Sequence, residues 1–370
     1  LLDKGSYIIR VGNSSNCTKV FGYIKLKEDI VTEELKNLNC FPDFEDFKPD
    51  IIYNDDLKNV QKITLTKNDF YIKRVEYTYK CKTESEIENL KDKELAKLCL
   101  GNYIDRKIEG SLAMGMGFAG QTTKYVEEVK DSLIMADGPA GLRLSKVYGI
   151  DYKGYHKLTP SPLFMNDYGY YETEGKISLT KDYSEDESKF SDYRKIVHQY
   201  ATALPIATAI AQTFNIEFAK KCGDIVGKEM EVFKVHLWLA PGMNIHRHIL
   251  CGRNFEYFSE DPLIAGKMAA GITLGVQNHK NKGVTLKHFT ANNQEFNRLN
   301  SNSKMSERAL REIYLKGFEI AIKEAHPHAL MTSYNLLNGV HTSENPQLLV
   351  DVLRDEWGYD GLIMTDWSHS

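Results

Sequence analysis

The sequence has 370 residues, of which 42% are hydrophobic and 26% charged, and its formal net charge is −4. This length allows two or three domains with full-sized cores, and the composition is ordinary for a globular protein. Because acidic and basic residues are interspersed, nothing favours nucleic acid or an anionic membrane as a partner. The sequence has no apolar run of about 18 residues, so no transmembrane helix is expected.

The six cysteines are scattered along the chain without a Cys-x-x-Cys spacing. In a chain of this length, that pattern is typical of reduced thiols rather than of a disulfide framework. We therefore expect a cytoplasmic protein.

Near the N-terminus, residues 5–26 alternate in hydrophobicity on both sides of the polar segment Gly12–Asn16. Such alternation around a turn predicts a β-hairpin. A hairpin alone is marginally stable in water, so we expect residues 1–28 to be the last strands of a β-sandwich. Residues 29–83 predict a linker with small β elements, and residues 84–98 suit a helix.

From residue 133 onward, short apolar runs end in polar residues and alternate with segments of helical period. This pattern predicts the α/β class with a parallel sheet that is buried on both faces. Polar residues at strand ends favour a (β/α)8 barrel over an open sheet. We count six strands and expect eight, which predicts a barrel over residues 84–370 that is truncated after about the sixth strand. The six runs are Leu133–Asp137, Leu204–Ala211, His236–Asn244, Val284–His288, Ala329–Asn335 and Leu362–Asp366.

Two helices are indicated between the later strands. Asn345 suits the N-cap and Pro346 the first helical position of a helix that Gly358 ends, and residues 306–325 show a second helical period. Between the first two strands, residues 148–196 form an insert rich in tyrosine and charge. The predicted apolar face of the 306–325 helix consists of Leu310, Ile313, Tyr314, Phe318, Ala321 and Ile322.

Polar residues stand near the ends of the predicted strands, where parallel strands place them at one mouth. Each has an ordinary explanation by itself, since a strand-end acid often caps a helix and a buried tyrosine often only packs. Together they suit carbohydrate chemistry, in which carboxylates and bases grip vicinal hydroxyls. A retaining glycosidase requires two carboxyl groups about 5–5.5 Å apart. The residues are Asp137, Arg253, Lys287, His288, Tyr334 and Asp366.

Four sequence segments strongly resemble glycoside hydrolase family 3, the β-glucosidase-type enzymes, and the likeness covers residues 90–370. The hairpin resembles the end of the fibronectin-III-like domain of the same enzymes. Because it precedes the barrel, the resemblance implies a member with permuted domain order. The four segments are MADGPAGLR, GRNFEYFSEDPLIAGKMAAGITLGVQ, LKHFTANNQEFNR and LMTSYNLLNGVHTSENPQLLVDVLRDEWGYDGLIMTDW.

The resemblance implies that Asp366 is the nucleophile that forms a covalent glycosyl-enzyme. Lys287 would hold nearby carboxylates ionised. The family's acid/base carboxylate usually comes from another domain and no glutamate here matches it, so we expect the chain to be a fragment, and whether it is active by itself is left open. Glu256, Glu260 and Glu295 are expected to position other groups. The implied substrate-binding residues are Asp137, Arg253, Lys287, His288, Tyr334 and Trp367.

The implied activity is that of a retaining exo-acting β-glycosidase, first of all a β-glucosidase, because Asp137 can hold the sugar hydroxyls at carbons 4 and 6. Its substrates would be β-linked gluco-oligosaccharides or aryl and alkyl glucosides. A β-xylosidase, an arabinosidase and an inactive sugar-binding remnant remain open. An N-acetylglucosaminidase is disfavoured. Those members of the family resemble KHFPGHG after the fourth strand, whereas Thr290–Asn293 follow Lys287 and His288 in this sequence.

Neither a metal nor another cofactor is expected. His246 with His248, and His326 with His328, form pairs without a third ligand at helical spacing. Aromatic stacking on a second sugar by the 148–196 insert and a plain surface loop are both left open. A homo-oligomer is also left open.

Overall fold

The computed structural model describes two compact units. The smaller comprises Leu1–Tyr79, Met305–Glu307 and Pro346–Gly358, and the larger comprises the rest. Within the described residues, no helix combines the length and the hydropathy that crossing a bilayer requires. The described residues are 1–14, 16–38, 45–46, 55, 57–80, 85–101, 118–122, 132–157, 170–173, 176–179 and 194–367.

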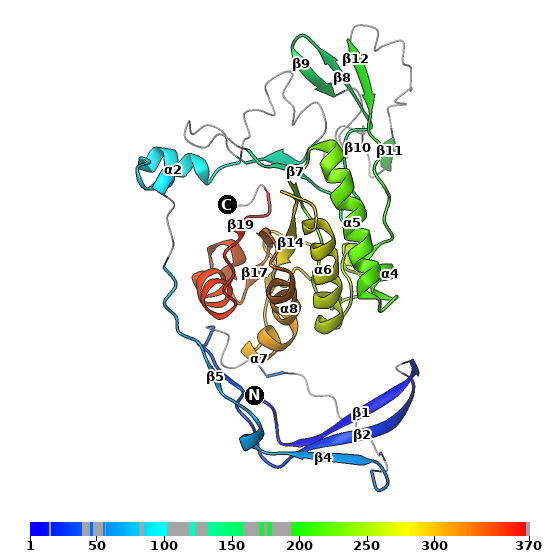
Figure 1. The fold of residues 1–370 in the computed structure, drawn as a ribbon, viewed down its shortest axis with the longest axis vertical. Coiled ribbons are helices and arrows are strands. Elements are labelled where there is room, and N and C mark those ends of the chain that lie inside the picture. Colours follow the sequence, from blue (N-terminus) through cyan, green and yellow to red (C-terminus); the bar gives the residue numbers. More distant parts are fainter. Residues whose placement is uncertain are drawn as a thin grey trace. The chain divides into compact units, whose positions relative to one another are not determined.

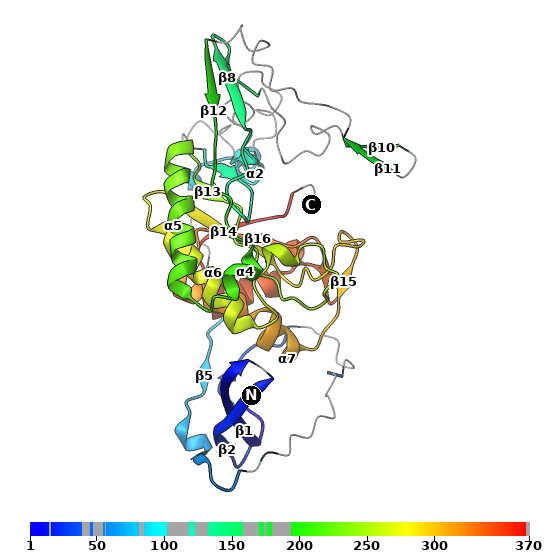
Figure 2. The same cartoon turned by 90° about the vertical axis from the view of Figure 1, so that its right-hand side faces the viewer.

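The predicted N-terminal hairpin is confirmed in the smaller unit. Strands β1 (Gly5–Ser14) and β2 (Cys17–Leu26) pair antiparallel (Figure 1 and Figure 2), and β4 (Gln61–Leu65) adds to β2 in parallel (Figure 1). The third strand therefore comes from residues 29–83, the segment predicted as a linker with small β elements. The assignment of residues 1–28 to a fibronectin-III-like sandwich stays a prediction. The unit also contains the parallel pair β3 (Glu33–Glu34) and β5 (Lys73–Arg74), and the 3-10 turn η1 (Lys67–Asp69).

The predicted helix after Pro346 is present in the same unit as the π-helix η8 (Gln347–Glu356). Pro346 occupies its N-cap position, and Gly358 follows its end with a φ of 66°. Glycine adopts this left-handed conformation without the clash of a Cβ atom.

Helix η8 also contacts residues 77–79, which lie at the end of the segment Leu1–Tyr79 of the smaller unit. The backbone amides of Thr78 and Tyr79 donate to Asp355 Oδ1 at 2.9 and 2.7 Å. The Tyr77 hydroxyl donates to Glu356 Oε1 at 2.7 Å. These contacts bring residues some 280 positions apart in the sequence into one compact unit.

The larger unit is built on a curled sheet of six strands in the order β19-β16-β14-β13-β7-β6 (Figure 1). Five strands are parallel and follow one another in chain order, while β6 pairs antiparallel with β7. The predicted α/β class with a parallel sheet is therefore confirmed, in the form of half a barrel. The strands are β6 (Gly120–Gln121), β7 (Ile134–Ala136), β13 (Leu237–Trp238), β14 (Gly283–Phe289), β16 (Ala329–Thr332) and β19 (Leu362–Met364).

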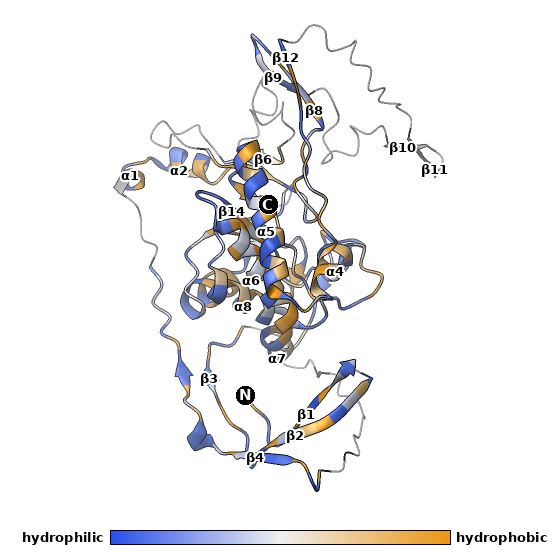
Figure 3. Cartoon of the chain, turned by 45° about the vertical axis from the view of Figure 1, so that its right-hand side comes forward, coloured by the Kyte–Doolittle hydropathy of each residue, from blue (hydrophilic) through white to orange (hydrophobic). Residues whose placement is uncertain are grey.

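Three helices precede strands of this sheet. Helices α5 (Ile216–Phe233), α6 (Pro262–Gln277) and α8 (Lys316–Ala325) lie side by side, with α6 in contact with both others (Figure 1). Hydrophilic and hydrophobic residues alternate along α5 (Figure 3), as expected for a helix with one buried face. A hydrophobic core of the unit contains Ala119, Met135, Leu237, Leu239, Ala329 and Met331.

The prediction of a strand over Leu204–Ala211 is wrong, and the sheet has five parallel strands rather than six. Residues 207–211 form the short helix α4 (Ala207–Ala211) instead. Its buried residues Ala207, Ile210 and Ala211 are spaced by three and four, which is a helical period. A short apolar run does not by itself distinguish a strand from a buried helical turn.

The helix predicted over residues 306–325 is interrupted by a wider turn. Helix α7 (Glu307–Ala309) leads into the π-helical segment η6 (Leu310–Tyr314) before α8 begins. A π turn holds more residues than an α turn, so it shifts the helical face. Ile313, predicted on the apolar face, is consequently 39% exposed.

The remaining described elements are short. Residues 84–98 contain two helices, α1 (Ser85–Glu88) and α2 (Asp92–Leu98), rather than one. In the 148–196 insert and at its edges, β8 (Val147–Asp151), β9 (Gly154–Lys157) and β12 (Lys195–His198) form an antiparallel sheet, and β10 (Tyr170–Thr173) pairs with β11 (Lys176–Leu179). The others are β15 (Asn302–Ser303), β17 (Leu336–Leu337), β18 (Val340–His341), and the 3-10 turns η5 (Asn254–Glu256) and η7 (Thr342–Glu344).

Helices α5 and α6 approach each other through glycines. A Cβ atom on Gly223 would lie 2.2 Å from the Ile272 carbonyl oxygen, and one on Gly275 would lie 2.1 Å from the Lys220 carbonyl oxygen. No side chain fits either gap, so the glycines set the distance between the helices that precede β13 and β14.

We predict that Gly275→Ala destabilises the chain, although alanine favours a helix over glycine by about 1 kcal/mol. Separating the packed helices should give a net loss of about 1–3 kcal/mol in the free energy of unfolding, measured by urea denaturation. Gly252→Ala is the control, because its Cβ would meet only the Glu295 side chain, at 3.8 Å. Equal stability of Gly275→Ala and the wild type would contradict this close packing.

Candidate active site

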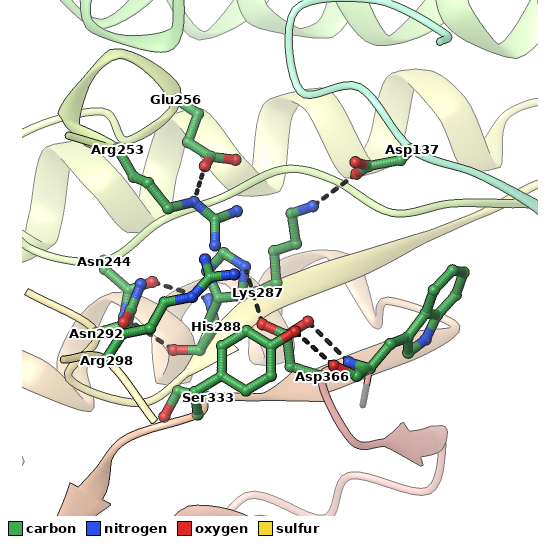
Figure 4. A network of polar contacts seen from close by, with 12 residues as sticks. Asp137, Asn244, Arg253, Glu256, Lys287, His288, Asn292, Arg298, Ser333 and Asp366 are labelled. Atoms are coloured by element: carbon green, nitrogen blue, oxygen red, sulfur yellow. Dashed lines mark hydrogen bonds and ion pairs between the residues drawn. The ribbon is translucent and has the colours of Figure 1, made fainter. Parts of the chain in front are cut away.

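The ends of three parallel strands bring charged side chains into one cluster (Figure 4). Asp137 follows β7, Lys287 and His288 lie near the end of β14, and Asp366 follows β19. Arg253 joins them from the loop after β13, just ahead of η5. All seven residues singled out in the sequence lie at this end of the sheet: Asp137, Arg253, Lys287, His288, Tyr334, Asp366 and Trp367.

Lys287 and Asp137 form the ion pair that joins β14 to β7. Lys287 Nζ lies 2.8 Å from Asp137 Oδ1, and the two side chains are 5% and 16% exposed. Burial by itself would raise the pKa of Asp137, but the charge and hydrogen bond of Lys287, aided by Arg143 at 3.6 Å, lower this pKa to about 2. Asp137 is therefore an ionised hydrogen-bond acceptor at neutral pH.

Two arginines in the cluster each pair with a glutamate three residues along the chain. Arg253 Nε donates to Glu256 across the 3-10 turn η5, whose three-residue period places both side chains on one side. Arg298 Nη1 donates to Glu295 Oε2 at 3.0 Å, and its guanidinium lies 4.6 Å from the centre of the Tyr334 ring.

His288 is buried and is held by its backbone as well as by its ring. Its amide donates to Asn244 Oδ1, and its carbonyl accepts from Asn244 Nδ2, both at 2.8 Å. Burial and the positive charges of Arg253, Lys287 and Arg298 hold the pKa of His288 well below its usual value. The imidazole is therefore neutral, with Nε2 placed 3.7 Å from Asp366 Oδ2.

The two carboxylate oxygens of Asp366 have different surroundings. Oδ1 accepts from the Trp367 amide at 2.9 Å, whereas Oδ2 is buried and has no hydrogen-bond partner among the described residues. Burial raises the pKa of Asp366, and the charges of Lys287 and Arg253 only partly offset this effect. Lys287 thus acts in the direction predicted from the sequence, but burial has the larger effect.

Tyr334 lies beside Asp366. Its hydroxyl donates to the Trp367 carbonyl oxygen at 2.5 Å. Burial and the negative charge of Asp366 raise the pKa of Tyr334 to about 12, against the opposing charge of Arg298. The phenol therefore remains a neutral hydrogen-bond donor next to the carboxylate.

Sequence reasoning missed three residues that the structure adds to the site, Tyr257, Asn292 and Arg298. All three lie inside segments already quoted, so their positions were visible, but their contacts depend on how the loops fold. The expectation that Glu256 and Glu295 position other groups agrees with their arginine contacts.

The arrangement can bind hydroxyl groups beside a carboxylate, Asp366, that has no bonded cation among the described residues. Ionised Asp137 accepts hydrogen bonds, while the lysine and the arginines donate them. Within the described ranges, no three histidine, cysteine, aspartate or glutamate side chains are grouped so that they could hold a metal ion.

Comparison with known proteins gives this arrangement a family context. Residues 191–370 match the family described as "Glycosyl hydrolase family 3 N terminal domain". Beta-glucosidase A of Butyrivibrio fibrisolvens is 49% identical over 166 residues, which cover 45% of this chain and 20% of that protein. An exo-alpha-(1->6)-L-arabinopyranosidase of Bifidobacterium longum is 51% identical over 167 residues, covering 45% and 22%.

Solved structures match a longer part of the chain. Beta-glucosidase 3B of Thermotoga neapolitana, in complex with alpha-D-glucose, superposes with a TM-score of 0.61 and 36% identity. The match covers 77% of this chain and 34% of that one. The chain thus spans about a fifth to a third of the length of these relatives.

We predict that Lys287→Met raises the pKa values of both Asp137 and Asp366, because it removes the charge that lowers them. Titration of the side-chain carboxyls by NMR in a chain with ¹³C-labelled aspartate measures both shifts. Lys282→Met is a matched control, since Lys282 is also buried but donates to the Val235 carbonyl oxygen, at 2.8 Å. An unchanged Asp137 pKa in Lys287→Met would refute the electrostatic role of the lysine.

Proposed function

Because residues 191–370 match the glycoside hydrolase family 3 N-terminal domain, we propose that the chain is the barrel part of a retaining exo-acting β-glycosidase with β-glucosides as substrates. The carrying observation is Asp366, whose Oδ1 is held by a backbone amide while its buried Oδ2 has no hydrogen-bond partner among the described residues. A nucleophilic carboxylate requires such an oxygen.

In the proposed reaction, Asp366 Oδ2 attacks the anomeric carbon of the terminal sugar. The bond from this carbon to the glycosidic oxygen breaks, and the leaving oxygen takes a proton from the general acid. Water then hydrolyses the glycosyl ester, and the residue that was the general acid now acts as general base. The two successive displacements at the anomeric carbon retain its configuration.

The surrounding residues are assigned to the hydroxyls of the bound sugar. Asp137 is ionised and can accept two hydroxyl hydrogen bonds, while Lys287 and Arg253 donate to neighbouring oxygens. His288 is a neutral donor beside Asp366. The Tyr334 hydroxyl donates its hydrogen to the Trp367 carbonyl oxygen, so its oxygen is assigned to accept from a sugar hydroxyl. The Trp367 indole packs on the hydrophobic core of the unit and is assigned to one wall of the sugar site.

We assign the general acid/base to a carboxylate outside the described cluster. A general acid must carry a proton at working pH, and the low pKa of Asp137 excludes it from that role. Glu256 and Glu295 each accept hydrogen bonds from an arginine, so neither is free to protonate a leaving group.

The second candidate substrate is an α-L-arabinopyranoside. Two relatives named exo-alpha-(1->6)-L-arabinopyranosidase match at 51% and 46% identity. This pyranose lacks carbon 6, so it would lose one hydroxyl that Asp137 can bind. A β-xyloside presents the same loss and forms the third alternative.

We predict that 2,4-dinitrophenyl 2-deoxy-2-fluoro-β-glucoside labels Asp366, because its leaving group departs without acid assistance. Mass spectrometry of the peptide that contains residues 362–367 measures the label, and Asp366→Asn should abolish it. Label on another residue would overturn the assignment of the nucleophile. If a folded chain with its acid/base domain present stays unlabelled, the glucosidase proposal fails.

The inactivation rate should fall tenfold per pH unit below the pKa of Asp366, since only the carboxylate attacks. Burial raises this pKa above 3.8, whereas Asp137 ionises near 2 and leaves the profile unaffected. Stopped-flow release of dinitrophenolate measures the rate. A profile that stays flat to pH values below 3.8 would contradict a buried nucleophile.

Substrate choice is tested by comparing nitrophenyl β-glucoside, β-xyloside and α-L-arabinopyranoside with the complete enzyme. We expect the highest kcat/KM for the glucoside, and we expect Asp137→Asn to reduce this preference because the ionised acceptor is lost. A higher kcat/KM for the arabinopyranoside would select the second candidate instead.

A further inference from the structure

The His288 ring lies between two polar groups, the Tyr257 hydroxyl and the Asp366 carboxylate. Its Nδ1 is 3.1 Å from the Tyr257 hydroxyl, and its Nε2 is 3.7 Å from Asp366 Oδ2. A neutral imidazole carries one proton, so one nitrogen donates and the other accepts. The position of this proton decides whether Asp366 faces an N–H group or a lone pair.

Asn292 settles the direction of the hydrogen bonds on the far side of the tyrosine. Its Nδ2 lies 3.0 Å from Glu295 Oε1 and 2.9 Å from the Tyr257 hydroxyl oxygen. Both oxygens of Glu295 act as acceptors, since Arg298 donates to the other one. The amide nitrogen must therefore face Glu295, and its second hydrogen is donated to Tyr257.

The hydrogen bond that Tyr257 accepts from Asn292 determines the one that it makes to His288. Tyr257 is fully buried, and its oxygen already accepts from Asn292. Its single hydrogen then points to the other polar neighbour in the described structure, His288 Nδ1. Since Nδ1 accepts, the ring proton lies on Nε2, on the side of Asp366.

We infer that Tyr257 is a positioning residue that, together with Asn292, holds His288 in its Nε2–H tautomer, so that the ring presents its one N–H donor on the side of Asp366. The tautomer follows from the hydrogen bonds around a neutral ring, whereas its effect on catalysis rests on the proposed function. In the other tautomer, the Nε2 lone pair would face the carboxylate oxygen and disfavour its ionised form.

The tautomer can be measured without any substrate. In the full chain with ¹⁵N-labelled histidine, long-range proton–nitrogen correlations distinguish protonated from bare ring nitrogens, and the His288 signals are those lost in His288→Asn. We expect the wild type to show a neutral ring with its proton on Nε2. A proton on Nδ1, or a doubly protonated ring at neutral pH, would overturn the inference even if no variant folds.

Tyr257→Phe removes the hydroxyl but keeps the aromatic ring. We expect its His288 to populate both tautomers, and we expect its inactivation by the fluoroglucoside to slow about 10- to 100-fold, the range known for partners that orient metal-binding histidines. A pure Nε2–H tautomer in this variant would show that Tyr257 does not set the proton position.

Tyr359→Phe is the matched control, because this hydroxyl is also buried but donates to the Leu362 carbonyl oxygen, at 3.1 Å. It should leave both the tautomer and the inactivation rate unchanged. If the wild type is never labelled, the proposed function fails while the tautomer result stands. If the wild type is labelled and Tyr257→Phe reacts at the same rate, the positioning role fails.

Discussion

The candidate site depends on how its charges, buried to different degrees, are matched. Taking charges out of water is costly unless each meets a partner. Three cations of the described cluster have a carboxylate partner each: Lys287 has Asp137, Arg253 has Glu256 and Arg298 has Glu295. Asp366 is the fourth carboxylate, and its nearest groups are neutral donors rather than a cation of its own.

This imbalance gives Asp366 its distinct character. The surrounding cations act on it at a distance and partly offset the effect of burial, but none neutralises it by direct contact. A carboxylate held in this way is less stabilised than Asp137, whose pKa is lowered to about 2 by a bonded lysine. For the proposed reaction, the less stabilised Asp366 suits a nucleophile, and the lysine-bonded Asp137 suits a fixed acceptor of hydroxyl hydrogen bonds.

The sequence was most informative about site residues that lie at or just after the end of a strand of the sheet. Asp137, Lys287, His288 and Asp366 all follow from apolar runs that end in a polar residue, and the structure brings them together. The Leu204–Ala211 run failed because a short apolar segment fits a buried helical turn equally well. The contacts of Tyr257 and Asn292 could not be predicted, since they require loop conformations that no periodicity encodes.

The three ion pairs also differ in how far apart their partners lie along the chain. Both arginine pairs close a loop of three residues, whereas Lys287 and Asp137 are separated by 150. Closing a longer loop costs more chain entropy, and long-range contacts slow folding. The pairs Arg253–Glu256 and Arg298–Glu295 can therefore form early and locally. The pair of Lys287 with Asp137 can form only once β7 and β14 belong to one sheet. Formation of this pair thus marks the step at which a set of local turns becomes a binding site.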